Sequence, residues 1–276
     1  MAEASVGRTH SAARKQSLQS LERGMAVIQI FSRERPALTL SEVARLTGMT
    51  RATARRILLT LEKLGHVRSE GRLFSLTPRV LTLGWAYLSS LNLWEVAQPF
   101  MEELASQTGE SCSAATLDLP DIVYVARIPT HRIMTISLGV GTRLPAHATS
   151  MGRVLLAGLP DEELERFLAS GPFERFTERT LTDADGLRAA VRQAREQGWA
   201  LVDQELELGL RSIAAPIVGQ GGRTIAALNT SASASRVSLD EFREQFLPAL
   251  VRTAELISAS VRRSPTGRAS PRPSGA

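Results

Sequence analysis

Residues 39–61, with the sequence TLSEVARLTGMTRATARRILLTL, contain the two short helices that decide the fold of the amino-terminal region. The pattern Thr39-x-x-Glu42 is a capping box, in which a side chain and a backbone donor at the helix start satisfy each other. Gly48 ends this first helix, and Thr50 can cap the next. The stretch therefore predicts two helices joined by a tight turn.

The residues on either side of this stretch complete a small domain. Two short apolar runs at 67–69 and 73–76 flank Glu70-Gly71 and predict a β-hairpin. A preceding helix is predicted by apolar residues at helical spacing, namely Leu18, Leu21, Met25, Ile28 and Phe31. Three helices followed by a hairpin are typical of a winged helix-turn-helix domain, which we expect over residues 17–78.

The third predicted helix has an apolar back and a free strip of small and basic residues. Arg51 and Arg55 are four residues apart and project together from its first turns. Such a face fits a recognition helix, because Arg can bind phosphate oxygens or pair with guanine. The sequence predicts DNA contacts for Thr50, Arg51, Ala52, Thr53, Arg55 and Arg56, and for Arg68 and Arg72 around the hairpin tip. The alternative is a solvated face, since 31 of the 33 basic residues are Arg.

The charges of the chain are distributed unevenly. Residues 1–92 hold 14 basic against 6 acidic side chains, whereas residues 93–262 hold 16 against 22. A basic head joined to an acidic body predicts that the head binds a polyanion.

The composition excludes several other classes of protein. The chain has 276 residues, enough for about two domains. Its single cysteine, Cys112, excludes an internal disulfide, and we expect no metal and no cofactor because the only candidate ligands, Cys112, His131 and His147, lack ligand-like spacing. We see neither a secretory signal nor an apolar run of the ~18 residues that span a bilayer. We therefore expect a cytoplasmic protein without a membrane partner.

The remaining chain predicts a linking helix and a second domain. Residues 79–91 are apolar on more than one side, so a linker at 79–92 should be buried between domains or between subunits, where it can form a homodimer. Within residues 93–262, strand patterns come first near 113–117, 122–128 and 133–138 and last near 199–202, 212–218 and 224–230, with helix patterns between them. This order predicts an α+β fold whose second domain is an α/β sensor on a mainly antiparallel sheet. The ends, 1–16 and 263–276, have compositions typical of disorder.

Several motifs, taken in order, resemble the IclR-type bacterial transcriptional regulators. They are SLERG (20–24), RATARRILLTL (51–61), RLPAHATSMGR (143–153), DQE (203–205), LGLRSIAAPI (208–217) and ALNTSAS (227–233). The resemblance covers about residues 17–262, and the stretch 143–157 is most similar to regulators of protocatechuate, 4-hydroxybenzoate and β-ketoadipate catabolism.

The resemblance implies a GAF-like effector-binding domain at 93–262, a small and often carboxylated effector, and dimers that can pair into tetramers on operator DNA. It carries effector contacts onto Ser150, Met151, Asp203 or its neighbour, Ser212, Asn229 and Ser231. The alternative for Ser212, Asn229 and Ser231 is ordinary sheet polarity. Asp203 and Glu205 fit a turn or an interface better than a catalytic pair.

The residues themselves point to an anion site at the same place. A helix should begin at Thr149 and Ser150, with Met151, Gly152 and Arg153 in its first turn, where free N–H groups and the helix dipole favour a carboxylate. Arg153 can bind that carboxylate or form a salt bridge, and His147 can contact the ligand or its own loop. We include His147, Gly152 and Arg153 in the predicted effector site.

Two alternatives to a regulator remain at this point. An enzyme that processes small acids needs a nucleophile and a base within hydrogen-bond reach. Ser150 near His147 lacks the first glycine of G-x-S-x-G, so we expect no catalytic residue and no enzyme. The second alternative is a winged-helix module that docks onto another protein.

Overall fold

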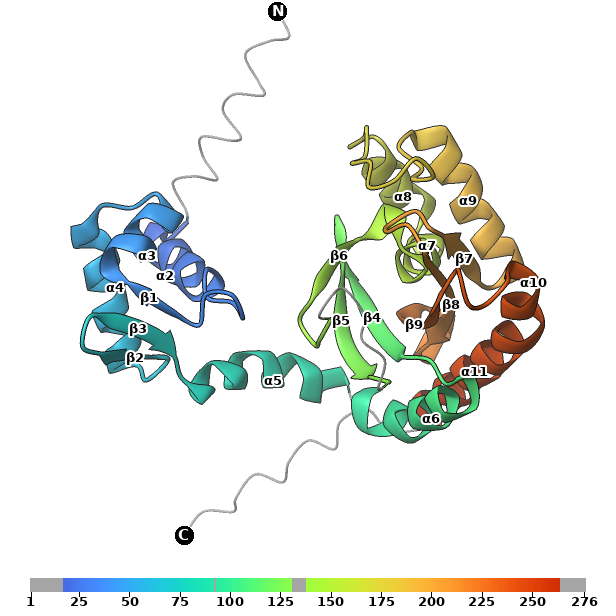
Figure 1. The fold of residues 1–276 in the computed structure, drawn as a ribbon, viewed down its shortest axis with the longest axis horizontal. Helices are drawn as coiled ribbons and strands as arrows, with labels where there is room; N and C mark the ends of the chain where they lie inside the picture. The colour runs from blue at the N-terminus through green and yellow to red at the C-terminus, as the bar shows by residue number, and fades with distance from the viewer. Residues whose placement is uncertain (1–16, 92, 131–137, 264–276) are drawn as a thin grey trace, which may run out of the picture. The chain divides into compact units, whose positions relative to one another are not determined.

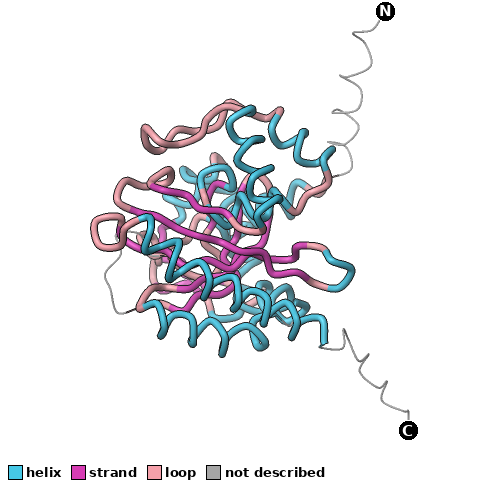
Figure 2. The backbone as a smooth tube through the Cα atoms, turned by 90° about the vertical axis from the view of Figure 1, so that its right-hand side faces the viewer, coloured by secondary structure: helices cyan, strands magenta, loops and turns pink. Residues whose placement is uncertain are grey.

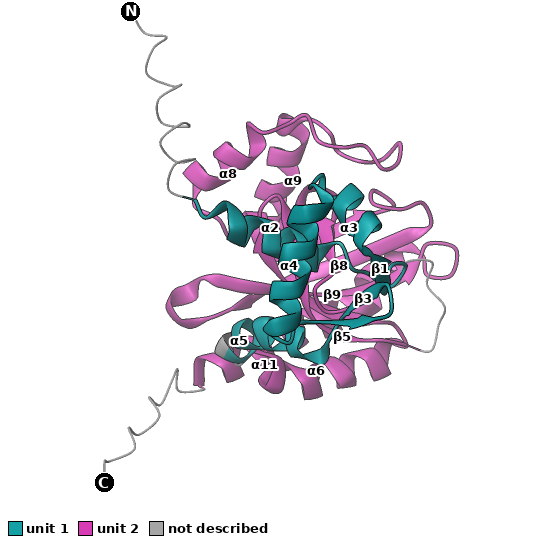
Figure 3. Cartoon of the chain, turned by 90° about the vertical axis from the view of Figure 1, so that its left-hand side faces the viewer, with its two compact units in different colours: residues 1–90 teal, residues 91–276 magenta. Residues whose placement is uncertain are grey.

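The computed structural model describes residues 17–91, 93–130 and 138–263, without the side chains of residues 90 and 91. The chain divides into two compact units, Met1–Ser90 and Leu91–Ala276, which Figure 1 and Figure 3 show. The division falls inside the linking segment that the sequence predicted.

The first unit is a helical bundle with a small sheet. It contains α2 (Gln19–Gln29), β1 (Ala37–Thr39), α3 (Leu40–Thr47), α4 (Arg51–Lys63), β2 (Val67–Glu70) and β3 (Leu73–Leu76), followed by η1 (Pro78–Val80) and α5 (Leu81–Leu91). The sheet is antiparallel with the order β1-β3-β2. The three helices and the hairpin are those of a winged helix-turn-helix domain.

The ends of α3 show why these residues form two helices. Thr39 Oγ1 accepts a hydrogen bond from the Glu42 backbone N–H at 3.3 Å, and a carboxylate oxygen of Glu42 accepts from the Thr39 N–H at 2.8 Å. The helix stops at Gly48, whose φ of +66° is strained for residues with a side chain. Burial of Val27, Val43 and Leu58 then fixes the packing of α2, α3 and α4.

Helix α5 leaves its apolar side chains exposed in this chain. The exposed fractions are 74% for Leu81 and 60% for Trp85, and Leu83 and Tyr87 are exposed as well. The sequence predicted that this helix is buried between domains and between subunits, and the first unit by itself does not bury it.

The second unit is built on one six-stranded antiparallel sheet with the order β6-β5-β4-β9-β8-β7. Its strands are β4 (Cys112–Asp118), β5 (Asp121–Ile128), β6 (Arg143–Pro145), β7 (Ala200–Asp203), β8 (Leu210–Val218) and β9 (Thr224–Ser233). Its main helices are α6 (Leu93–Thr108), α7 (Ser150–Ala157), α8 (Asp161–Leu168), α9 (Ala184–Gln197) and α11 (Leu247–Arg263). Short turns at η2 (Ala146–Ala148), η3 (Gln220–Gly222), α10 (Leu239–Glu241) and η4 (Phe242–Phe246) complete it.

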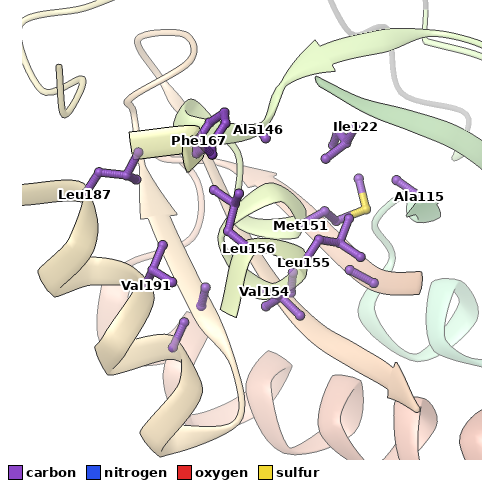
Figure 4. Close-up of a cluster of buried hydrophobic side chains, with 14 of the residues drawn as sticks. Ala115, Ile122, Ala146, Met151, Val154, Leu155, Leu156, Phe167, Leu187 and Val191 are labelled. Atoms are coloured by element: carbon purple, nitrogen blue, oxygen red, sulfur yellow. The ribbon is translucent and has the colours of Figure 1, made fainter. Parts of the chain in front are cut away.

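Helices cover both faces of this sheet, as Figure 2 shows. Helices α6 and α11 pack on one face, and α7 lies on the other with α9 against it. The core under α7 joins Met151 and Leu155 to residues of the sheet such as Ala115 and Ile122 (Figure 4). This second face carries the candidate site.

The fold class expected from the sequence is confirmed, although two short strands were missed. Strands β1 and β6 were missed, because each has three residues and exists only through pairing with β3 or β5. The strand expected at 133–138 lies almost wholly outside the described residues, as does His131.

Candidate functional site

Helix α4 presents the basic face that the sequence predicted. Thr50 caps the helix by accepting the Thr53 N–H at 3.2 Å. Ala54, Leu58 and Leu61 are buried against the domain core. Arg51, Ala52, Arg55 and Arg56 are exposed on the other side, and Thr53 lies at its border. The local fold therefore places the small and basic residues together on the solvent side.

The arginines of this face differ from several arginines of the second unit that form ion pairs. Within the part of the chain that the structure describes, Arg51, Arg55 and Arg56 have no ion-pair partner, whereas Arg143, Arg188 and Arg195 each bind carboxylates. Unpaired guanidinium groups on a helix remain available for phosphate oxygens and base edges.

The hairpin adds two more exposed arginines. Arg68 on β2 donates through Nε to Ser75 Oγ at 3.1 Å, and Arg72 lies at the tip. The hairpin is fixed to α4 because a carboxylate oxygen of Glu62 accepts the Ser69 N–H at 3.1 Å. The tip and the face of α4 are thus held in one rigid unit.

The second unit contains a small cavity between α7 and the sheet. Its volume is about 30 Å³, which is room for about two water molecules. Its lining comes from Tyr124, Leu138, Leu144, Ala148, Thr149, Ser150, Met151, Val202, Leu206, Glu207, Leu210, Ser212, Asn229 and Ser231.

Two buried polar atoms that line this cavity lack a partner. Ser150 Oγ and Asn229 Oδ1 form no hydrogen bond with any described residue. Ser150 is 1% exposed and Asn229 is 6% exposed, so bulk water does not satisfy them. An unpaired buried polar group costs about 1–3 kcal/mol, which a ligand that hydrogen-bonds to it can recover.

The sheet register explains how the polar residues meet. Ser212 on β8 pairs with Ser231 on β9, and Asn229 lies two residues before Ser231 on the same face. The side chain of Met151, in the first turn of α7, covers them from the other side of the cavity. Ser150, Met151, Ser212, Asn229 and Ser231 are thereby brought together, as the resemblance implied.

The start of α7 differs in part from the expected anion site. Thr149 Oγ1 accepts the Gly152 N–H at 3.1 Å, so this donor is already used. Gly152 is not among the residues that line the cavity, and its role is steric. A Cβ added there would lie 2.0 Å from the carbonyl oxygen of Ala146, so the close packing of η2 on α7 requires glycine.

Arg153 and Asp203 have carboxylate and guanidinium partners inside the protein. Arg153 Nη2 lies 2.5 Å from Glu205 Oε2, and both side chains are buried. Asp203 binds Arg179 at 2.5 Å and Arg211 at 3.1 Å. Neither Arg153 nor Asp203 is among the residues that line the cavity. Arg153 pairs with Glu205 just after β7, and Asp203 at the end of β7 pairs with Arg211 on β8.

His147 also lies outside the cavity. Its ring stacks on Phe173 and Phe176, and Nε2 lies 2.9 Å from the carbonyl oxygen of Glu174. Burial lowers the pKa of His147, although the bond to Glu174 opposes this effect. His147 therefore binds the segment 173–176 that follows α8, and it forms no hydrogen bond with Ser150.

The described residues offer little for other chemistry. Burial raises the pKa of the Cys112 thiol, which makes it a poor nucleophile at neutral pH. No three His, Cys, Asp or Glu side chains cluster as metal ligands within 17–91, 93–130 and 138–263. In those same ranges, no helix has the length and apolar character needed to cross a bilayer.

Sequence reasoning missed most of the apolar wall. Tyr124, Leu144, Val202, Leu206 and Leu210 come from five separate segments, and nothing in their local pattern distinguishes them from core residues. Glu207 was also missed, although a charged side chain between leucines at 206 and 208 is a visible irregularity.

Comparisons with known proteins agree with this arrangement. Residues 20–71 match the IclR helix-turn-helix domain, and residues 85–259 match the bacterial transcriptional regulator IclR C-terminal domain. The chain is 47% identical to the Pca regulon regulatory protein of Pseudomonas putida over 235 residues, 85% of this chain and 81% of that protein.

Solved structures extend the likeness to three dimensions. A transcriptional regulator from Rhodococcus sp. RHA1 has a TM-score of 0.79 at 54% identity, covering 89% of this chain and 98% of that one. An IclR homologue from Microbacterium hydrocarbonoxydans, solved with 4-hydroxybenzoate, has a TM-score of 0.80 at 28% identity, covering 89% and 100%.

Proposed function

The chain belongs to the IclR family of bacterial transcriptional regulators, and we propose that it sets the expression of a catabolic operon by sensing a small aromatic acid. In this proposal α4 and the hairpin bind operator DNA. The cavity under α7 binds the effector, and the protein acts in the cytoplasm. Its relatives are regulators rather than enzymes, and so is this protein.

The effector half of the proposal depends on one observation. Ser150 Oγ and Asn229 Oδ1 are buried, face the same cavity and have no partner among the described residues. The apolar remainder of the lining, with Tyr124 and Met151, suits an aromatic ring. The homologue that was solved with 4-hydroxybenzoate supports a hydroxybenzoate over an aliphatic acid such as β-ketoadipate.

The size of the cavity implies that binding is coupled to movement. A volume of about 30 Å³ holds about two waters, much less than an aromatic acid. The segment 204–209 is anchored at both ends. Glu205 forms an ion pair with Arg153, and the carbonyl oxygen of Gly209 accepts a hydrogen bond from the Ala234 N–H. Leu206 and Glu207 lie between these anchors and line the cavity, so we propose that they shift when the effector enters.

We also propose that the protein acts as a homodimer, which can pair into a tetramer on DNA. The exposed apolar residues of α5, such as Leu81 and Trp85, support a contact between two copies of this helix. A dimer places two winged domains on a two-fold symmetric operator.

Operator binding tests the DNA half. We expect Arg51→Ala and Arg55→Ala each to weaken binding to the protein's own upstream DNA. Each should also make the affinity less dependent on salt, because fewer counterions are released. The matched control is Arg192→Ala, since Arg192 is an exposed arginine on α9 in the second unit. If both α4 variants bind like wild type, the groove assignment is wrong, and a flat salt dependence in wild type would indicate a protein-docking module.

A thermal-shift screen tests the effector half. An aromatic acid that binds the folded protein should raise the Tm, by an amount that grows with its concentration. Asn229→Ala should remove most of the shift for 4-hydroxybenzoate, while Arg51→Ala should retain it. If no aromatic or dicarboxylic acid raises the Tm, the protein does not sense this class of effector.

A further inference from the structure

A polar row continues from the cavity across the sheet to Arg127. Ser113 on β4 pairs with Asn229 on β9 on one side and with Arg127 on β5 on the other. Directly opposed residues of antiparallel strands project to the same face. Arg127 therefore lies on the face of the sheet that carries the cavity, two strands away from Asn229.

A β-bulge makes this placement possible. Ala115 pairs with Tyr124, but Ala114 pairs with Ala126, so Val125 is an extra residue in β5. Without the bulge, Tyr124 and Arg127 would point to opposite faces, because they are three residues apart. With it, both project toward the α7 side of the sheet.

The guanidinium group of Arg127 reaches across to the start of β4. Its Nη1 donates to Ser113 Oγ at 3.3 Å, and its Nη2 donates to Ser111 Oγ at 3.4 Å. Adjacent strands are about 4.8 Å apart, so this group is about one strand spacing from the column that holds Asn229 and Ser231. A carboxylate between them can contact both sides.

The charges around the cavity favour an anion at this end. Glu207 lines the cavity from the segment between β7 and β8, on the opposite side of β9 from Arg127. Burial lowers the pKa of Arg127 and raises the pKa of neighbouring Tyr124 to about 12, so Tyr124 is neutral at pH 7. An effector carboxylate is thus repelled from the Glu207 side and attracted toward Arg127.

We propose that Arg127 binds the carboxylate of the effector, with Ser111 and Ser113 orienting its guanidinium group. This assignment deepens the proposed function and depends on it. The charge of Arg153 is balanced by the buried carboxylate of Glu205, and Thr149 Oγ1 accepts one of the N–H donors at the start of α7. The ligand class is therefore an aromatic acid whose carboxylate lies over β4 and whose ring lies toward Met151.

The experiment compares an acid with its uncharged isostere in the full-length protein. 4-Hydroxybenzoate and 4-hydroxybenzamide are titrated calorimetrically into wild type, Arg127→Met and Arg127→Lys. Hydrogen bonds to a charged group are worth about 10- to 100-fold in affinity, so wild type should prefer the acid by about that factor. Arg127→Met should lose this preference while it retains its affinity for the amide within about threefold.

Two controls separate the charge from general damage. Arg127→Lys keeps the positive charge and should still prefer the acid, even if Arg127→Met is less stable. Arg192→Met removes an exposed arginine from α9 and should bind both ligands like wild type. The affinity of each variant for operator DNA without effector reports whether it is folded.

The outcomes distinguish this assignment from the proposed function. If Arg127→Met still prefers the acid by the wild-type factor, Arg127 does not bind the carboxylate, although the protein remains an aromatic-acid sensor. If Ser150→Ala removes the preference instead, the start of α7 is the carboxylate site and the assignment is overturned. If wild type binds neither compound nor any related acid, both proposals are wrong.

Discussion

At the scale of single residues, Arg153 illustrates why a buried charge must be interpreted through its partner. The sequence left open whether it binds the effector or an internal carboxylate. Glu205 is 52 positions away, and its carboxylate also accepts the Leu181 N–H at 3.3 Å. A buried ion pair adds little to the free energy of unfolding. Replacing only one partner is nevertheless costly, because the other charge is left buried and unpaired.

Glu205→Gln should therefore lower the free energy of unfolding by about 3–5 kcal/mol in the absence of any ligand. The double variant Arg153→Met/Glu205→Gln should lose less than this single variant, because no unpaired charge remains. Urea denaturation of the three proteins measures the difference. An unchanged stability in Glu205→Gln would mean that Arg153 has another partner.

The candidate site was predictable from sequence only in part. The family resemblance assigned Ser150, Met151, Ser212, Asn229 and Ser231 to the effector site, and these five residues line the cavity. Residues whose role depends on distant partners were not recognisable. The partners of Asp203, for example, are Arg179 and Arg211. Arg127 was missed because its face is set by the bulge at Val125, and a bulge is a property of the strand pair.

At the scale of elements, the capping box of α3 gives the first unit a pH dependence. Hydrogen bonds from Thr39 hold the pKa of Glu42 below its usual value of 4.5. A carboxyl whose pKa is lowered in the folded state stabilises the fold at pH values above its usual pKa. This stabilisation is lost as the pH falls through the lowered pKa.

Unfolding curves between pH 7 and pH 3 should therefore show that Glu42→Gln loses less stability on acidification than wild type. Glu70→Gln is the control, because Glu70 is an exposed acid on β2 of the same domain. If wild type and Glu42→Gln lose stability in parallel, the carboxylate of Glu42 does not contribute to the cap.

The contact between η2 and α7 depends on Gly152. Gly152→Ala should lower the free energy of unfolding by about 3 kcal/mol or more, because the new Cβ would force the backbone at Ala146 to move. In Gly24→Ala on α2, the new Cβ has no other atom within 4 Å, so this variant should raise the free energy of unfolding by about 0.5–1 kcal/mol. Thermal unfolding of both variants gives the comparison, and equal effects would refute the steric role of Gly152.

Most elements of the fold followed from local signals. Thr39, Gly48 and Thr50 mark helix ends through side-chain and backbone preferences that act within a few residues. Strands β1 and β6 gave no such signal, because three residues carry no periodicity and become strands only beside β3 and β5. Preferences of neighbouring residues therefore predict where helices and longer strands form. Short edge strands depend instead on pairing with a strand that is distant in the sequence.

At the scale of the whole molecule, effector and DNA must influence each other equally. If 4-hydroxybenzoate changes operator affinity by some factor, the operator must change the affinity for 4-hydroxybenzoate by the same factor. We expect a factor of roughly 5–150 in either direction. Fluorescence anisotropy with labelled operator and calorimetry with the preformed complex measure the two values, and unequal factors would show that assembly contributes a further step.

The exposed apolar residues of α5 predict how the protein assembles. Trp85→Glu should shift the protein toward monomers, because a charge replaces an apolar side chain that we expect at the contact between two chains. Operator affinity should fall with it, whereas effector affinity should not. Sedimentation velocity checks the mass. The control is Leu256→Glu, which changes an exposed leucine on α11 of the second unit; a dimeric Trp85→Glu would rule out the α5 contact.

The near absence of free volume under α7 has a consequence for how much signal the cell must supply. A receptor that has to open before it can bind has an apparent Kd larger than its intrinsic Kd, by the inverse of the open fraction. If the segment 204–209 opens as proposed, the dose at which the operon responds is set by the stiffness of that segment as well as by contacts with the aromatic ring. Substitutions at Leu208, which is exposed, could retune that dose without altering which acid is recognised.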